Sequence, residues 1–155
     1  ADGYGNTADA FHLTAPAQGG SGAALAMKKA LDQAKMPPDQ VDYINAHGTG
    51  TRLTDPSETA AIKQVFGQHA YGLAVSSTKS MTGHEMWMGG ASEVVYSLLM
   101  MKNNFVAPNL NFENPDEYSG KLNINAQTLE QGFNVFLSNA FGFGGTNSSL
   151  IIKKI

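Results

Sequence analysis

The sequence predicts an α/β fold in which helices pack on a mixed β-sheet. Its first two thirds alternate between helical and extended patterns, beginning with a small-residue helix that starts near Ser21 and ends before Pro37. Strands are predicted at 133–139 and 148–154, and the glycine-rich loop between them favours an antiparallel pair. Alternating helices and strands that end in such a pair are typical of a layered α/β domain.

The other predicted strands come from short apolar runs. Two lie at 41–46 and 73–77, and a third, short strand could form at 121–125. The glycine-rich stretch 1–20 is expected to form a loop, with one short extended segment at 9–14. The sheet should therefore contain four or five strands.

Two more helices are predicted after the first two strands. Asp55 suits an N-cap, Pro56 the first helical position, and Glu58 the third position of a capping box. Gly67 is the expected C-cap of this helix. The other helix covers about 86–102 and is apolar over most of its surface, which predicts a central, buried helix.

Composition narrows the classes of function. The chain has 155 residues, which is the size of one domain and long enough to bury a core. Its net charge of −3 provides no electrostatic case for binding nucleic acid or an anionic membrane. It has no cysteine, so it contains neither a disulfide nor a thiolate nucleophile. It begins in a glycine-rich loop without a signal peptide, as expected for part of a longer protein.

Three loops, at 47–51, 79–84 and 141–147, each follow a predicted strand. Such loops are where α/β proteins bind ligands. If they meet at one edge of the sheet, they bring together His47, His84, a lysine ammonium and several backbone N–H groups. This set of groups can stabilise an oxyanion or an enolate. The loops contain no nucleophile of their own.

The same loops carry motifs through which the chain resembles a known family. The motifs are Asn45-Ala46-His47-Gly48-Thr49-Gly50-Thr51, Thr78-Lys79-Ser80-Met81-Thr82-Gly83-His84 and Ser138-Asn139-Ala140-Phe141-Gly142-Phe143-Gly144-Gly145-Thr146-Asn147. In these motifs, and nearly from end to end, the chain resembles the C-terminal half of β-ketoacyl-[acyl carrier protein] synthases. These are the type I and II elongating condensing enzymes of fatty acid synthesis, which have a thiolase-like fold. The resemblance implies that 1–155 form a single C-terminal thiolase-like half-fold.

The resemblance also implies a reaction and its partners. A cysteine in the N-terminal half, which this chain lacks, takes an acyl group from acyl carrier protein. Malonyl-acyl carrier protein then loses CO₂, and its carbanion attacks the acyl thioester. The substrates are carried on the phosphopantetheine of the carrier protein, and no other cofactor is expected. The implied partners are acyl carrier protein, the N-terminal half and a second copy in a cytoplasmic homodimer.

The family's site residues carry over onto the matching positions. The resemblance implies that His47 and His84 hold the malonyl thioester carbonyl and stabilise the enolate, while Lys79 organises the charge of the site. We expect Glu58 to be the charge partner of Lys79, although a helix cap explains this glutamate equally well. His47, His84 and Asp55 lack the spacing of metal ligands, so no metal site is expected.

Other positions match the substrate-binding part of the family. The resemblance implies that Thr49 and Thr51 hydrogen-bond the pantetheine arm and that Thr14 lies near the mouth of the pocket. Phe143 would gate the pocket, and its backbone N–H would complete an oxyanion hole with the cysteine. Phe141 belongs to the same gating loop, although either aromatic ring could instead be part of the core.

One segment, at 85–90, departs from the family pattern. Most members have a Leu- and Ala-rich helix start there, whereas this chain has Glu85, Met86 and Trp87. The preferred acyl-chain length therefore stays open. Two other functions also stay open, namely a non-catalytic synthase-like subunit of the chain-length-factor type and a polyketide ketosynthase domain. In either case a half-fold should expose an apolar face where the missing half packs.

Overall fold

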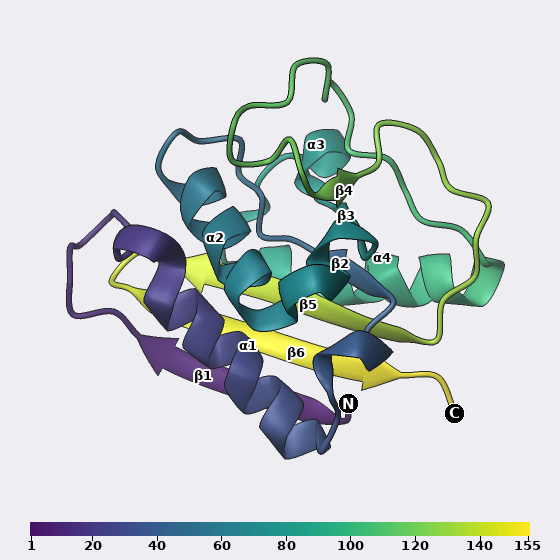
Figure 1. Ribbon diagram of the computed structural model, residues 1–155, viewed down its shortest axis with the longest axis horizontal. Coiled ribbons are helices and arrows are strands. Elements are labelled where there is room, and N and C mark those ends of the chain that lie inside the picture. The colour runs from purple at the N-terminus through teal and green to yellow at the C-terminus, as the bar shows by residue number, and fades with distance from the viewer.

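The computed structural model describes residues 1–155, and a six-stranded mixed sheet forms its middle layer (Figure 1). The strands are β1 Gly3–Ala8, β2 Tyr43–Asn45, β3 Ala74–Ser76, β4 Asn123–Ile124, β5 Val135–Gly142 and β6 Thr146–Lys153. Their order across the sheet is β1-β6-β5-β2-β3-β4. β5, β2, β3 and β4 run parallel, whereas β6 is antiparallel to both β5 and β1. The predicted fold class and the antiparallel pair at the end of the chain are confirmed.

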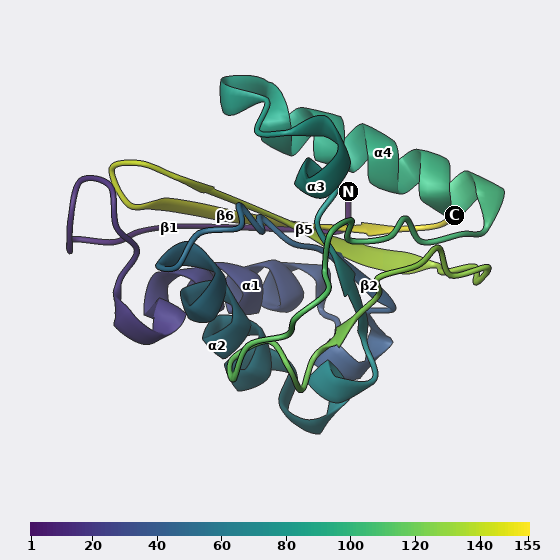
Figure 2. The same cartoon turned by 90° about the horizontal axis from the view of Figure 1, so that it is seen from above.

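Helices cover both faces of this sheet (Figure 2). The helices are α1 Ser21–Ala34, α2 Thr54–Phe66, α3 Lys79–Thr82 and α4 Gly89–Asn103, with 3₁₀ turns η1 Gln18–Gly20, η2 Pro38–Gln40, η3 Gly67–Tyr71 and η4 Met86–Met88. Figure 2 shows α1 and α2 together on one face and α4 on the other. No helix combines the length and the hydropathy needed to cross a membrane.

Two hydrophobic clusters fill the space between these layers. The larger one joins α1 and α2 to the sheet through side chains such as Met27, Ile62 and Leu137. The smaller one joins α4 to the opposite face, where Met100 packs near Phe136. Because both faces of the central strands are covered, β2 and β3 are buried at every position rather than at alternate positions.

The prediction that 1–20 form a loop was wrong for β1. This edge strand pairs with β6 from Gly3 to Ala8. A Cβ atom at Gly3 would collide with the carbonyl oxygen of Ala30 on α1, and one at Gly5 would collide with that of Ala26. The two glycines, which suggested a loop, instead let α1 pack directly on the backbone of the strand.

The capping box predicted for α2 was also wrong. The helix begins at Thr54 without a side-chain cap. Asp55 instead accepts a hydrogen bond from the backbone N–H of Gly50 at 3.2 Å, while Glu58 turns into the interior. The expected C-cap at Gly67 is confirmed, since this glycine has a positive φ of 54°.

The prediction that α4 is a central, buried helix holds on one side only. Met100 and Met101 face the sheet, but Val95, Leu98 and Leu99 are 53%, 42% and 51% exposed. The reason is that no other element of this chain packs over that side of α4 (Figure 2). The predicted exposed apolar face is thus present on α4. Exposed apolar side chains that gather in this way are typical of a surface on which another element packs.

Candidate active site

The three predicted loops meet at one edge of the sheet. β2 lies between β5 and β3 and is parallel to both. The carboxyl ends of parallel strands share an edge, so the segments that follow β2 and β3 and the end of β5 are neighbours. The expected convergence of the loops is therefore confirmed.

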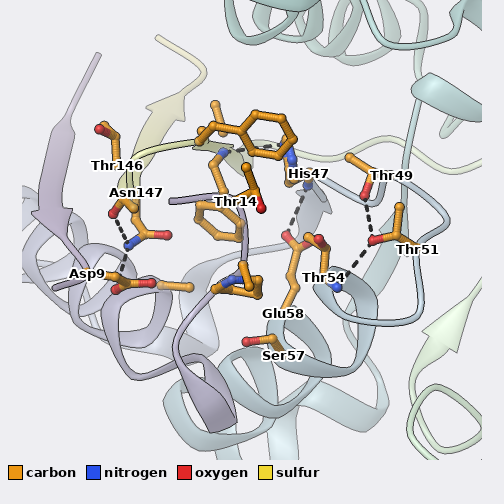
Figure 3. A pocket seen from close by; sticks show the side chains of 18 of the residues that line it. Asp9, Thr14, His47, Thr49, Thr51, Thr54, Ser57, Glu58, Thr146 and Asn147 are labelled. Atoms are coloured by element: carbon orange, nitrogen blue, oxygen red, sulfur yellow. Dashed lines mark hydrogen bonds between the residues drawn. The ribbon is translucent and has the colours of Figure 1, made fainter. Parts of the chain in front are cut away.

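A pocket of about 800 Å³ opens between these loops and the segment after β1. Eight of the nine predicted site residues line it, namely Thr14, His47, Thr49, Thr51, Glu58, His84, Phe141 and Phe143. Figure 3 shows Thr14, His47 and Glu58 close together, with Thr49 and Thr51 beside them. The ninth, Lys79, lines a neighbouring pocket of about 620 Å³ to which His84 also contributes.

The two histidines lie side by side in this pocket. Their ring centroids are 5.6 Å apart, and the rings are nearly perpendicular, at 84°. His47 Nδ1 accepts the backbone N–H of Phe141 at 3.4 Å, and His84 Nδ1 accepts that of Met86 at 3.0 Å. An imidazole nitrogen that accepts a hydrogen bond carries no proton, so each neutral ring has its proton on Nε2. The site therefore holds two Nε2–H donors with the same tautomer.

His47 is kept uncharged by its surroundings. Its side chain is buried, and burial lowers its pKa from 6.5 to about 3, with further lowering from the positive charge of Lys79. At physiological pH it can therefore donate a hydrogen bond but cannot act as a charged acid. A neutral donor stabilises negative charge on a carbonyl oxygen without giving up its proton.

Lys79 pairs with Glu93 and not with Glu58, so the predicted charge partner was wrong. Both members of the ion pair are buried, Lys79 on α3 and Glu93 in the first half of α4. Burial raises the pKa of Glu93 to about 6, although the Lys79 ammonium opposes this shift. Glu93 could have been noticed in the sequence as the one carboxylate inside the apolar pattern of this helix.

Glu58 holds the backbone of the histidine loop instead. Its carboxylate accepts hydrogen bonds from the backbone N–H groups of His47 at 3.0 Å and Gly48 at 2.9 Å, and from Asn139 Nδ2 at 3.0 Å. Burial raises the pKa of Glu58, while the hydrogen bonds from Gly48, Asn139 and His47 lower it. Glu58 thus fastens α2 to the loop after β2 and to β5, and it positions His47.

Replacing Glu58 by alanine should lower the free energy of unfolding by about 3 kcal/mol, because three buried donors lose their acceptor. Urea denaturation followed by circular dichroism measures the change. Glu58→Gln, which keeps one acceptor oxygen, should cost less. The exposed Glu130→Ala is the matched control, expected to change stability by less than about 0.5 kcal/mol. Equal effects at the two glutamates would contradict the positioning role.

Two loops that border the pocket are tied to each other. Leu13 O accepts the backbone N–H of Gly144 at 2.6 Å, and Gly145 O accepts that of Asp9 at 2.7 Å. Asn147 Nδ2 also donates to Asp9 Oδ1 at 3.0 Å (Figure 3). Sequence reasoning missed this pairing, which places the segment of Thr14 beside the loop of Phe143.

The remaining predicted residues differ in how they are held. Thr49 and Thr51 share a hydrogen bond of 3.3 Å between their hydroxyls, and Thr51 Oγ1 also accepts the Thr54 N–H at 3.2 Å (Figure 3). Phe143 is 81% exposed at the turn between β5 and β6, whereas the Phe141 ring lies 5.4 Å from that of His47. The structure contains no cluster of three or more histidine and carboxylate side chains that could hold a metal ion.

Comparisons with known proteins identify the family to which the chain belongs. The model of the family described as "Beta-ketoacyl synthase, C-terminal domain" matches residues 1–113. The 3-oxoacyl-[acyl-carrier-protein] synthase 2 of Coxiella burnetii is 46% identical over 153 residues, which cover 99% of this chain and 37% of that protein. The chain thus spans little more than a third of the length of this relative.

Solved structures of ketosynthases share the fold. A type II PKS acyl-carrier protein in complex with its ketosynthase, bound to the hexaketide, matches with a TM-score of 0.95 and 32% identity, over 99% of this chain and 38% of that one. A ketosynthase in complex with its chain length factor, from Xenorhabdus doucetiae, matches with a TM-score of 0.90 and 34% identity, over the same shares. The expected thiolase-like fold is confirmed, and the chain belongs to the beta-ketoacyl synthase C-terminal domain family.

Proposed function

We propose that this chain is the C-terminal half of a 3-oxoacyl-[acyl carrier protein] synthase that elongates fatty acids by decarboxylative Claisen condensation. The observation that carries this proposal is the pair of Nε2–H donors from His47 and His84 in one pocket that contains no nucleophile. Two neutral donors suit a reaction whose negative charge develops on a single carbonyl oxygen. The attacking sulfur would come from a cysteine in the N-terminal half.

The reaction would use these donors at the decarboxylation step. The malonyl thioester carbonyl accepts hydrogen bonds from His47 and His84. The bond to the carboxylate carbon then breaks, CO₂ leaves, and the electron pair moves into an enolate held by the same donors. The enolate carbon attacks the acyl-cysteine carbonyl, a carbon–carbon bond forms, and the cysteine thiolate leaves. The Phe143 N–H would help hold the oxyanion of this second step.

The polar side of the pocket suits the carrier arm. Thr49 and Thr51 present hydroxyls beside His47, and Thr14 lines the other side (Figure 3). Hydroxyls can both donate to and accept from the amides of phosphopantetheine. Acyl carrier protein would therefore be the partner that delivers both substrates. The exposed side of α4 would pack against the N-terminal half, and the complete protein would be a cytoplasmic homodimer.

A second candidate is a polyketide ketosynthase or its non-catalytic chain-length-factor subunit. The similar structures include a ketosynthase with a type II PKS acyl-carrier protein, at 32% identity, and a ketosynthase in complex with its chain length factor, at 34%. Both identities are below the 46% of the 3-oxoacyl-[acyl-carrier-protein] synthase 2 from Coxiella burnetii. A polyketide enzyme would use the same chemistry on another acyl group. The presence of His47, Lys79 and His84 favours an active enzyme over a non-catalytic subunit.

The test uses the full-length protein with malonyl- and acyl-acyl carrier protein. We expect it to release CO₂ and to form a 3-oxoacyl product, because the cysteine and the two histidines are then in one molecule. This 155-residue chain by itself should form no product, since it has no thiolate to hold the acyl group. Mass spectrometry of the carrier protein and a CO₂ assay follow the two steps. A full-length protein that releases no CO₂ would indicate the non-catalytic subunit instead.

A further inference from the structure

The turn that follows His84 has an unusual backbone. Met86 has a φ of +52°, in the left-handed region that side chains other than glycine rarely adopt. In this conformation its N–H donates to Nδ1 of His84 at 3.0 Å. The turn continues with the Met88 N–H, which donates to the carbonyl of Glu85 at 3.1 Å. The tautomer of His84 therefore depends on a backbone conformation that must be held by something else.

A side-chain contact fastens this turn to α4. Glu85 Oε1 accepts a hydrogen bond from the hydroxyl of Tyr96 at 2.7 Å. The nearby Ser92 hydroxyl and the hydrogen bond from Tyr96 lower the pKa of Glu85, so the carboxylate is ionised and a strong acceptor. Ser92 and Tyr96 lie four residues apart and therefore on one face of the helix. Glu85 is thus held by the helix while its neighbours, His84 and Met86, line the pocket.

We propose that Glu85 and Tyr96 form a positioning pair that holds the Met86 N–H against His84 and thereby keeps the His84 proton on Nε2. Glu85 sits between the two residues that share this hydrogen bond, so its anchor on α4 limits how the backbone on either side can rotate. Without the anchor, Met86 can relax to negative φ and its N–H turns away from His84. The His84 ring is then free to rotate or to place its proton on Nδ1, and the second donor of the site is lost.

This inference rests on the proposed decarboxylation, in which His84 donates from Nε2. Neither Glu85 nor Tyr96 would touch the substrate. Both would act indirectly, through the backbone of the turn that contains His84 and Met86. Their loss should therefore lower kcat of decarboxylation more than it changes KM for malonyl-acyl carrier protein. A general loss of structure would not lower kcat while leaving KM nearly unchanged.

The experiment compares Glu85→Ala, Glu85→Gln and Tyr96→Phe in the full-length protein. Glu85→Ala and Tyr96→Phe should each lower kcat about tenfold with KM changed by less than about twofold. Glu85→Gln keeps an oxygen that accepts from Tyr96 and should retain most of the activity. The double variant Glu85→Ala/Tyr96→Phe should lose no more than either single one, because both remove the same bond. Glu130→Ala and Tyr71→Phe, on the surface outside both pockets, are the matched controls.

A second readout follows the tautomer itself. With ¹⁵N-histidine labelling, the ring nitrogens of His84, assigned by their absence in His84→Ala, distinguish a protonated Nε2 from a protonated Nδ1. The parent protein should show Nε2–H, and Glu85→Ala and Tyr96→Phe should show a mixture. Unchanged ring signals and kcat within about twofold in both variants would overturn the proposal. So would a Glu85→Gln variant as impaired as Glu85→Ala. The ring signals need no turnover, so they judge the positioning pair even if the full-length protein releases no CO₂.

Discussion

Replacing His47 by alanine in the full-length protein should lower the rate of malonyl decarboxylation by about a hundred- to a thousandfold. The variant removes one of the two Nε2–H donors that would hold the developing enolate oxygen. Because burial keeps His47 uncharged, with a pKa of about 3, the loss should be nearly independent of pH between 6 and 8, about the range of ordinary assays. Release of CO₂ from malonyl-acyl carrier protein measures the step directly.

Two comparisons make this result specific. His69 lies outside the pocket, where its Nε2 contacts the carbonyl of Val41 at 2.8 Å, so His69→Gln should leave decarboxylation unchanged. Transfer of the acyl group to the cysteine forms no enolate and should fall much less in His47→Ala than decarboxylation does. A His47→Ala protein that decarboxylates at the rate of the parent would refute the assigned role.

Replacing Lys79 by methionine should destabilise the protein by about 3 kcal/mol at pH 7.5, because it leaves the buried carboxylate of Glu93 without its partner. Methionine fills much of the volume of the lysine stem, so the loss reports mainly on charge. Urea denaturation measures the change. The double variant Lys79→Met/Glu93→Gln should recover most of the stability, since neither of these two positions then carries a buried charge. Lys154→Met, at an exposed position, is the matched control, with an expected change of less than about 0.5 kcal/mol.

The effect of pH provides a second check on the same pair. Burial raises the folded-state pKa of Glu93 to about 6, above its usual 4.5, so the folded protein holds this proton more tightly than the unfolded chain does. The stability contributed by this protonation is complete below pH 4.5 and is lost as the pH rises through about 6. Removing the ammonium of Lys79 raises the pKa of Glu93 further. The loss of unfolding free energy caused by Lys79→Met should therefore become smaller as the pH falls toward 4.5. A loss that is independent of pH would contradict the pairing of Lys79 with Glu93.

Much of the site could be predicted because its signals are local. The strands β2, β3 and β5 are apolar runs, and glycines and polar residues follow where each one ends. Parallel strands place their carboxyl ends at one edge, so loops far apart in the sequence had to meet. His47 and His84 could be identified from their places in these loops, before any distance between them was known.

The predictions that were wrong concern features that are not local, since each depends on which other element packs nearby in the folded protein. The conformational preferences of Gly3 and Gly5 predict a loop, but both glycines lie in a strand because the backbone of α1 leaves no room for a Cβ atom at either position. The sequence likewise suggests Glu58, on the helix after the histidine loop, as the charge partner of Lys79. In the folded protein the Glu58 carboxylate accepts hydrogen bonds from backbone N–H groups, and α4 places Glu93 beside Lys79 instead.

The sequence by itself therefore determined the α/β class, the three loops and the two histidines, because periodicity and strand ends are properties of neighbouring residues. The tertiary structure decided the partner of each buried charge, the tautomer of each histidine and the edge strand β1. These depend on which groups packing brings within hydrogen-bond distance. A buried carboxylate or ring nitrogen pairs with the donor that the fold presents to it, whatever its distance along the chain.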